Sequence, residues 1–197
     1  MSLVPMILHR EGNSERAMDL YSKMLADRII FLQGEVRDDM ANLIVSQLLF
    51  LEAEDPSAPI TMYINSPGGS VTAGLAIMNT MKYIKCPVHT VGMGMCASMG
   101  AFLLASGERH HRTVLTDTTV MIHQVLGGAQ GQVTDMEIRV EYSRSLKDKL
   151  NKYLSEFTYG KTDYETMVQL CERDNFLTAE RALEIGLIDN IASEREE

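Results

Sequence analysis

The sequence predicts an α/β fold built around a largely parallel, buried sheet. Over the first 125 residues, short β-branched and apolar runs alternate with longer stretches in which apolar residues recur at helical spacing. Two glycine-rich turns, at 68–69 and 92–100, lie where an expected strand passes into an expected helix. Such alternation is typical of βαβ crossover units, which bring parallel strands side by side.

The expected elements follow the chain without a linker that would divide it. Residues 1–13 carry a short apolar patch and a polar hinge, so we expect a flexible N-terminal segment there and one domain over 14–197. We expect helices over 14–25, 38–51, 71–84, 97–105, 133–157, 163–171 and 179–185. We expect strands over 28–32, 60–64, 87–93, 113–115, 119–123 and 187–191.

Several helix boundaries are marked by residue types with a positional preference. Ser14 and Thr178 are N-cap types, whereas Gly160 and Gly186 are typical of the residues that end helices. The stretch 133–157 is longer than an average helix and has a narrow apolar seam among charges. That seam suits packing either on the sheet of the same chain or on a helix of another subunit.

Composition limits the class of protein. The chain has 197 residues, enough for one domain with a sizeable core, and 45% of them are hydrophobic. The net charge of −9 disfavours nucleic acid or an anionic membrane as the main partner. Three cysteines without metal-ligand spacing indicate reduced thiols, so we expect a cytoplasmic protein with no membrane-spanning segment.

The segment Gly94–Gly100 is the first candidate for chemistry. It places Ser98 among small residues between an expected strand and an expected helix. One interpretation is an N-capping serine. The other is a nucleophile presented beside free backbone N–H groups. Cys96 is a rival nucleophile, although an unpaired cysteine is usually a small buried hydrophobe.

A serine nucleophile requires a base and an orienting acid. His123 ends the apolar run 120–122 just before a glycine-rich loop, at a strand end where catalytic groups gather in α/β sheets. Asp174 is slightly favoured as the acid because it lies in a polar break between two expected helices. The other acids after His123 are Asp135, Glu137, Asp148, Asp163, Glu172 and Asp189. The order Ser, His, Asp differs from that of α/β-hydrolases.

Neither a nucleotide nor a metal site is predicted. Gly160-Lys161-Thr162 resembles the end of a P-loop, but an expected helix precedes it and the first glycine of the motif is replaced by Ser155. We interpret the run 109–112, with two histidines and two arginines, as a polar surface turn rather than a metal site. We therefore expect no cofactor in this chain, so that any ATP would be hydrolysed by another chain.

Four separate motifs, in order along the chain, resemble the ClpP family, the proteolytic subunits of ATP-dependent Clp proteases. They are Asn65–Gly69, Gly94–Ala101, Met121–Gln124 and Glu172–Phe176. The resemblance runs from about residue 14 to residue 191. It implies a serine endopeptidase that hydrolyses peptide bonds of unfolded polypeptides through an acyl-enzyme.

The resemblance also implies a role for each matched residue. Ser98 matches the nucleophile, His123 the general base and Asp174 the orienting acid. The backbone N–H groups of Gly69 and Met99 match the oxyanion hole.

The implied fold is a crotonase-like core of repeated ββα units with a protruding strand-helix handle at about 125–158. Handles would join two stacked heptameric rings into a homo-oligomeric barrel, with Arg173 coupling the rings to the active site. Val4–Leu8 matches the axial segment at the entrance pore. A Clp-type AAA+ unfoldase would deliver substrates by docking on apolar pockets that include Tyr63 and Tyr83.

Two other functions fit parts of the pattern. A crotonase-fold enzyme acting on acyl thioesters would use the same oxyanion geometry without a serine nucleophile. A non-catalytic subunit could complete a mixed barrel. The set Ser98, His123 and Asp174 argues against both.

Overall fold

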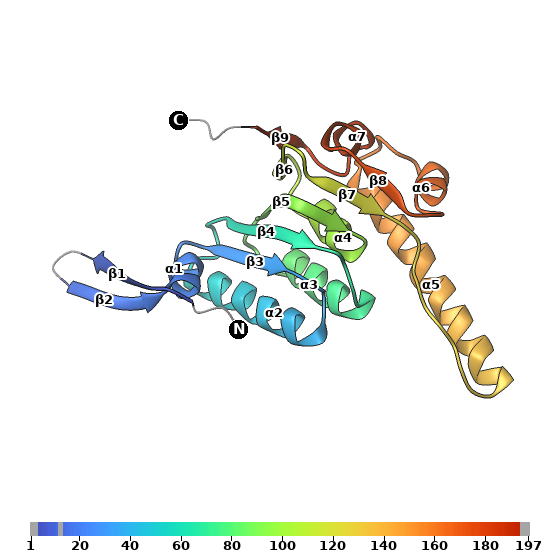
Figure 1. Ribbon diagram of the computed structural model, residues 1–197, viewed down its shortest axis with the longest axis horizontal. Coiled ribbons are helices and arrows are strands. Elements are labelled where there is room, and N and C mark those ends of the chain that lie inside the picture. The colour runs from blue at the N-terminus through green and yellow to red at the C-terminus, as the bar shows by residue number, and fades with distance from the viewer. Residues whose placement is uncertain (1–3, 12–13, 194–197) are drawn as a thin grey trace.

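The computed structural model describes residues 4–11 and 14–193, and these residues form a mixed α/β structure (Figure 1). The strands are β1 (Met6–Glu11), β2 (Ser14–Asp19), β3 (Ile29–Gln33), β4 (Ile60–Ser66), β5 (Val88–Ala97), β6 (Arg112–Leu115), β7 (Thr119–Ile122), β8 (Asn175–Leu177) and β9 (Asn190–Ala192). The helices are α1 (Leu20–Ala26), α2 (Asp38–Glu54), α3 (Val71–Tyr83), α4 (Met99–Ala105), α5 (Val133–Phe157), α6 (Tyr164–Leu170) and α7 (Ala179–Ile185). The expected α/β class is confirmed.

The main sheet branches at β5. Strands β3, β4, β5, β6 and β9 are neighbours in that order and run parallel. The first half of β5 pairs with β6 through Thr90–Gly92, and its last residues, Met95–Ala97, pair with β7 instead. Gly94, at φ 65°, lies between the two halves in a conformation that favours glycine. The end of β5 is therefore enclosed by β4 and β7.

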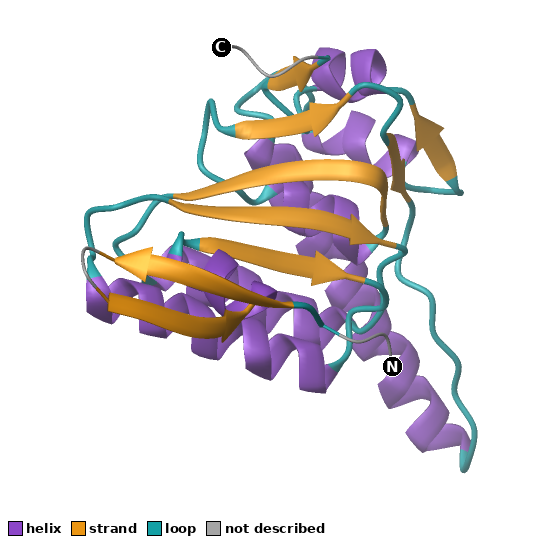
Figure 2. Ribbon diagram, turned by 60° about the vertical axis from the view of Figure 1, so that its left-hand side comes forward, coloured by secondary structure: helices purple, strands orange, loops and turns teal. Residues whose placement is uncertain are grey.

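The core lies between this sheet and helices α2, α3 and α4, which run along one side of β3, β4 and β5 (Figures 1 and 2). Alternate residues of β3 and β4 are fully buried, among them Ile30, Leu32, Ile60, Met62 and Ile64. Each such side chain contributes about 1.5–3 kcal/mol on burial. All seven residues of α4 are buried, as expected for a helix that is apolar or small all round.

The N-terminal region differs from the expectation. The expected helix over 14–25 is wrong in its first half, because β2 pairs antiparallel with β1 and α1 begins only at Leu20 (Figure 1). Asp19, not Ser14, caps α1 by accepting from the Ser22 backbone N–H at 3.0 Å. Part of the expected flexible segment 1–13 is thus a strand, and residues 1–3 and 12–13 lie outside the described residues.

Most of the other boundaries agree closely, with small shifts, but the strand expected over 187–191 is found only as β9 at Asn190–Ala192. Thr178 caps α7 and Gly186, at φ 89°, ends it as expected. Gly160 lies beyond α5, which already ends at Phe157. Strand β5 extends to Ala97, so the following helix begins at Met99 and not at residue 97. Strand β8 occupies a stretch interpreted from sequence as a polar break between helices.

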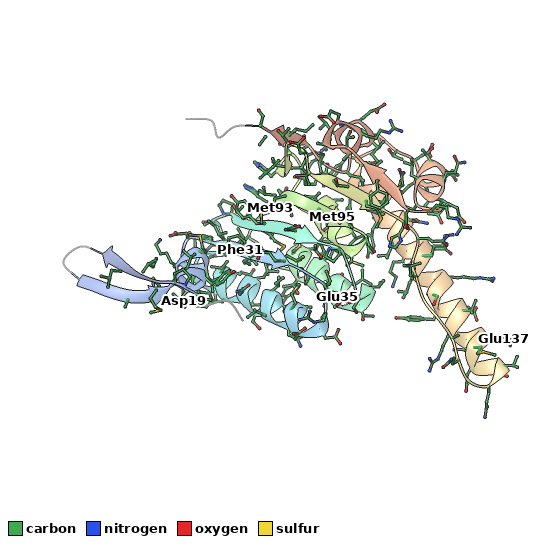
Figure 3. All side chains as sticks on the ribbon, in the orientation of Figure 1. Asp19, Phe31, Glu35, Met93, Met95 and Glu137 are labelled. Carbon is green, nitrogen blue, oxygen red and sulfur yellow. The ribbon has the colours of Figure 1, made fainter. Side chains whose placement is uncertain are left out.

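Helix α5 and the segment 123–132 that runs alongside it extend beyond the rest of the molecule, with Glu137 toward the outer end of the helix (Figures 1 and 3). The expected strand-helix handle is wrong in its first part, because residues 123–132 pair with no strand in the described part of the chain. The inner half of α5 packs on the same chain, through Leu146, Leu154 and Phe157. Its outer half leaves apolar side chains exposed, among them Val133, Ile138, Val140 and Tyr142. The inner half of α5 thus packs on its own chain, and the exposed apolar side chains of the outer half suit packing on another subunit.

The expected surface turn at 109–112 is wrong for Arg112. Its side chain is buried and donates to Asp189 from Nε at 2.8 Å and from Nη2 at 2.6 Å. Burial opposes ionisation of Asp189, but the hydrogen bonds and charge of Arg112 outweigh it and lower the pKa of that carboxyl. The pair is long-range in sequence, so composition alone gave no sign of it.

Candidate active site

Adjacent strand ends place Ser98 and His123 together. In the parallel pair of β5 and β7, Ala97 is opposite Met121. The next residue, Ser98, donates its backbone N–H to the Met121 carbonyl at 2.8 Å. Because parallel strands end at the same edge of a sheet, the residues that follow β5 and β7 emerge side by side.

The register of β7 with β8 brings in Asp174. These strands are antiparallel, and Ile122 is opposite Asn175. The residue after Ile122 therefore faces the residue before Asn175, which places His123 against Asp174. The residue pattern alone favours Asp174 only slightly, because it does not mark the short strand β8.

The three side chains form a continuous hydrogen-bonded chain. Ser98 Oγ lies 2.8 Å from His123 Nε2, and His123 Nδ1 lies 3.1 Å from Asp174 Oδ1. The His123 side chain is largely buried, with 11% of its surface exposed, whereas that of Asp174 is 65% exposed. A base held between a hydroxyl and a carboxylate can accept a proton from the first and be oriented by the second.

Ser98 does not act as a helix cap. It occupies the N-cap position of α4, yet its side chain makes no capping hydrogen bond. Its backbone is at φ 53° and ψ −118°, a region that side-chain-bearing residues rarely adopt and that costs about 1–3 kcal/mol. The capping interpretation is therefore wrong, and the strained turn directs the hydroxyl toward His123.

The turn after β4 packs directly on Ser98. A Cβ added at Gly68 would lie 2.7 Å from Ser98 Cβ and 3.0 Å from the Met99 nitrogen. Gly68 also has φ +95°, so both space and conformation require glycine. The two turns therefore meet backbone to backbone.

This packing leaves the N–H groups of Gly69 and Met99 available. Val36 donates to the Gly68 carbonyl and accepts from the Ser70 N–H, both at 2.8 Å. In such pairing the N–H of the middle residue, Gly69, points away from Val36. Met99 is the first residue of α4, where N–H groups lack intrahelical acceptors. Within the described residues, neither N–H donates to a protein group.

A mainly apolar cavity of about 220 Å³ opens beside Ser98. Gly69, Ser98 and His123 lie at one part of its wall, and α5 contributes Lys147, Leu150, Asn151 and Leu154. The other lining residues are Pro67, Val71, Met99, Phe102, Met121, Ile122, Gln124, Val125 and Leu126. The cavity can hold an apolar side chain next to the serine hydroxyl.

Asn151 is a polar exception in this wall. Its residue is 2% exposed, and its buried Nδ2 has no hydrogen-bond partner among the described residues. An unsatisfied buried donor costs about 1–3 kcal/mol. Nothing in the sequence marks Asn151, because its burial depends on how α5 packs against the rest of the chain.

The rival nucleophile and the other acids are placed differently. Cys96 is fully buried, and burial raises the pKa of its thiol to about 12. Its Sγ donates to the Ile64 carbonyl at 3.3 Å. Among the acid candidates, Asp189 binds Arg112 and Asp163 caps α6.

A polar bridge beside the three residues was not foreseen. Lys147 Nζ donates to Gln124 Oε1 at 3.1 Å and to Glu172 Oε2 at 3.0 Å. Gln124 Nε2 donates to the Glu172 backbone carbonyl at 2.7 Å. Gln124 and Glu172 do lie within the sequence motifs, but nothing in the sequence marked Lys147.

The remaining predicted residues lie away from the hydroxyl. Arg173 is exposed next to Asp174. Tyr83 is 81% exposed, and Tyr63 is half-buried and stacks on Phe31 at a ring-centroid distance of 5.7 Å. Val4–Leu8 carries exposed apolar side chains at the start of the hairpin.

In the described parts of the chain, no group of three or more His, Cys, Asp or Glu side chains is arranged to hold a metal ion. The helices described there also include none that combines the length and apolarity needed to cross a membrane.

Residues 12–195 match the family model described as Clp protease. The matched range includes Ser98, His123 and Asp174, the turn at Gly68–Gly69, and all of α5.

Proposed function

Because the chain belongs to the Clp protease family, we propose that it is a serine endopeptidase subunit with Ser98 as its nucleophile. Membership in the family indicates a peptidase. The observation that supports Ser98 as the nucleophile is the continuous hydrogen-bonded chain from Ser98 Oγ through His123 to Asp174.

In the proposed reaction, Ser98 Oγ attacks the carbonyl carbon of a peptide bond while His123 Nε2 takes the hydroxyl proton. The carboxylate of Asp174 holds the imidazole in place and stabilises its positive charge. The N–H groups of Gly69 and Met99 donate to the carbonyl oxygen as it becomes an oxyanion. His123 then gives its proton to the leaving amine, and water hydrolyses the acyl-enzyme.

The cavity beside Ser98 suggests which substrates are bound well. Its side-chain lining is mainly aliphatic, with Val71, Leu126, Leu150 and Leu154 among its members. We propose that it receives an apolar side chain on the N-terminal side of the scissile bond. No part of this mechanism calls for a cofactor.

We further propose that the protein works as a cytoplasmic homo-oligomer of two stacked heptameric rings. The exposed apolar residues on the outer half of α5 support an interface there. A Clp-type AAA+ unfoldase would use ATP and supply unfolded polypeptides. Arg173 would couple ring contacts to the adjacent Asp174.

Hydrolysis of a fluorogenic peptide with leucine before the reporter tests this proposal. We expect wild-type activity to fall by about 10³-fold or more in Ser98→Ala and in His123→Ala. Binding of coenzyme A esters in place of peptide cleavage would favour the thioester enzyme. A ring assembly that cleaves nothing, even with an unfoldase, would favour the structural subunit.

A further inference from the structure

The bridge of Gln124, Lys147 and Glu172 joins three segments that meet beside the catalytic set. Gln124 directly follows His123, and Glu172 lies two residues before Asp174. Lys147 belongs to the inner half of α5. Thus one side chain of the long helix contacts both the segment that carries the base and the segment that carries the acid.

The bridge is closed and charged. Lys147 Nζ, Gln124 Oε1 and Glu172 Oε2 are joined by contacts of 3.1 and 3.0 Å, and the 2.7 Å contact from Gln124 Nε2 to the Glu172 carbonyl completes the ring. The hydrogen bond and charge of Lys147 lower the pKa of the Glu172 carboxyl. The Lys147 side chain is 26% exposed and that of Glu172 is 54% exposed, so the ammonium is partly shielded while the carboxylate remains in contact with water.

Few other contacts hold the acid in place. The Asp174 side chain is 65% exposed, so buried packing does not fix it. The strand after it, β8, contributes three paired residues to β7. Before it, Cys171 is fully buried at the end of α6. Between these two anchors, the Glu172 contacts fasten the turn to the segment that begins at His123.

We propose that Lys147 is a positioning residue that holds the His123 and Asp174 segments together, and that the placement of α5 thereby sets the contact between base and acid. The inference rests on the proposed function, because it concerns the same reaction. Loss of the ammonium group leaves Gln124 Nε2 with its contacts to the Glu172 carbonyl at 2.7 Å and to Glu172 Oε1 at 3.4 Å, but leaves neither residue tied to α5. A misplacement of about 1 Å at a reacting centre can lower the rate by about 10²-fold.

Lys147 also lines the cavity beside Ser98, which gives a rival role. If it contacted bound peptide directly, its loss would mainly raise KM. A positioning role would mainly lower kcat, because the base is disturbed and not the binding wall. The two parameters therefore separate the two roles.

Peptide hydrolysis by Lys147→Met, Lys147→Arg and Glu172→Gln tests the inference, with Lys152→Met as the control. Lys152 is exposed on the same helix. We expect Lys147→Met to lower kcat by about 10-fold or more with KM changed less than about threefold. Lys147→Arg should restore most of kcat, since a guanidinium can donate to both acceptors.

A double variant tests whether Lys147 and Glu172 act together, and the native mass of each variant shows whether it assembles like the wild type. If Lys147 acts through Glu172, the combined Lys147→Met and Glu172→Gln variant should lose little more than Lys147→Met alone. Equal kcat in Lys147→Met and Lys152→Met would overturn the inference, as would a pure KM effect or fully additive losses. An inactive wild-type protein would instead remove the proposed function itself.

Discussion

The nucleophile and the acid of the candidate site are held in contrasting ways. Ser98 follows the branching strand of the sheet, precedes the fully buried helix α4 and packs against the backbone of Gly68. Asp174 lies on an exposed turn, after α6 and before a three-residue strand, beside a bridge of polar side chains. Buried packing fixes the first, whereas hydrogen bonds at the surface fix the second.

The buried turn at Ser98 and the exposed turn at Asp174 should differ in how easily they rearrange. Close-packed interiors have discrete arrangements, and small changes of volume are costly there. Polar contacts at a surface contribute less and can be remade with water. We therefore infer that the nucleophile and oxyanion donors are permanent features of the fold, and that the contact with the acid is the adjustable part.

The buried side should be the more sensitive to added volume. A Cβ at Gly68 would meet Ser98 Cβ and the Ala97 carbonyl at less than 3 Å, and the residue has positive φ. We expect Gly68→Ala to lower kcat/KM by about 10³-fold, because it displaces the hydroxyl and the oxyanion donors together. Steady-state hydrolysis of the fluorogenic peptide measures the effect.

Gly128→Ala is the matched control, since an added Cβ there meets no atom within 4 Å. It should keep nearly full activity if its native mass equals that of the wild type. Equal activity in Gly68→Ala and Gly128→Ala would contradict the tight packing at Ser98.

The exposed acid should matter less. Loss of a buried triad aspartate in a well-studied protease lowers kcat by about 10⁴-fold. Because the Asp174 side chain is 65% exposed, water can partly replace it. We expect Asp174→Asn to lower kcat/KM by about 10²-fold. A loss as large as that of His123→Ala would show that Asp174 is held as firmly as the base.

A substitution at Cys96 distinguishes a residue that contributes to core packing from one that takes part in the reaction. Burial raises the pKa of its thiol to about 12, so it is protonated near neutral pH. We expect Cys96→Ala to keep peptide hydrolysis within about threefold of wild type while lowering the free energy of unfolding by about 1–2 kcal/mol. Denaturant titration measures the second quantity. Loss of activity in a folded Cys96→Ala would restore the thiol as a candidate nucleophile.

The smallest effect concerns the pH dependence of the surface bridge. Lys147 lowers the pKa of Glu172 below its ordinary value of 4.5 in the folded protein. Its contribution to stability is therefore present above the unfolded pKa and disappears as the pH falls through the lowered value. We expect the Tm difference between wild type and Glu172→Gln to be small at neutral pH and absent in acid. A difference that persisted in acid would mean that Glu172 acts without its charge.

Much of the fold could be predicted because its signals are local. The alternation of strands and helices follows from apolar spacing, and strand ends then identified Ser98 and His123. The parts of the fold that the sequence did not predict depend on contacts with residues far along the chain. Residues Ser14–Asp19 form a strand because they pair with β1, although Ala17, Met18 and Tyr21 also fit helical spacing. The buried guanidinium of Arg112 is paired with Asp189, which is far along the chain but lies beside it because β9 pairs with β6.

Contacts between distant parts of the chain also explain why the sequence alone did not determine the acid and did not mark Lys147. The assignment of Asp174 depends on the register of Ile122 with Asn175, which no local pattern encodes. The motif resemblance supplied that residue, and the strand pairing gives the physical cause of its placement. Lys147 was marked neither by a local pattern nor by a motif, because it is one of several charged residues on a long polar helix. Only the packing of the turn at Glu172 against it distinguishes it from its neighbours.

Labelling with a fluorophosphonate serine probe, read by native mass spectrometry on one sample, tests the central claim most directly. We expect one label on each wild-type chain, located at Ser98 by peptide mapping, and none on Ser98→Ala. Cys96→Ala should be labelled as fully as the wild type. Equal labelling of Ser98→Ala and wild type, or an unlabelled wild type in its assembled form, would contradict Ser98 as the nucleophile.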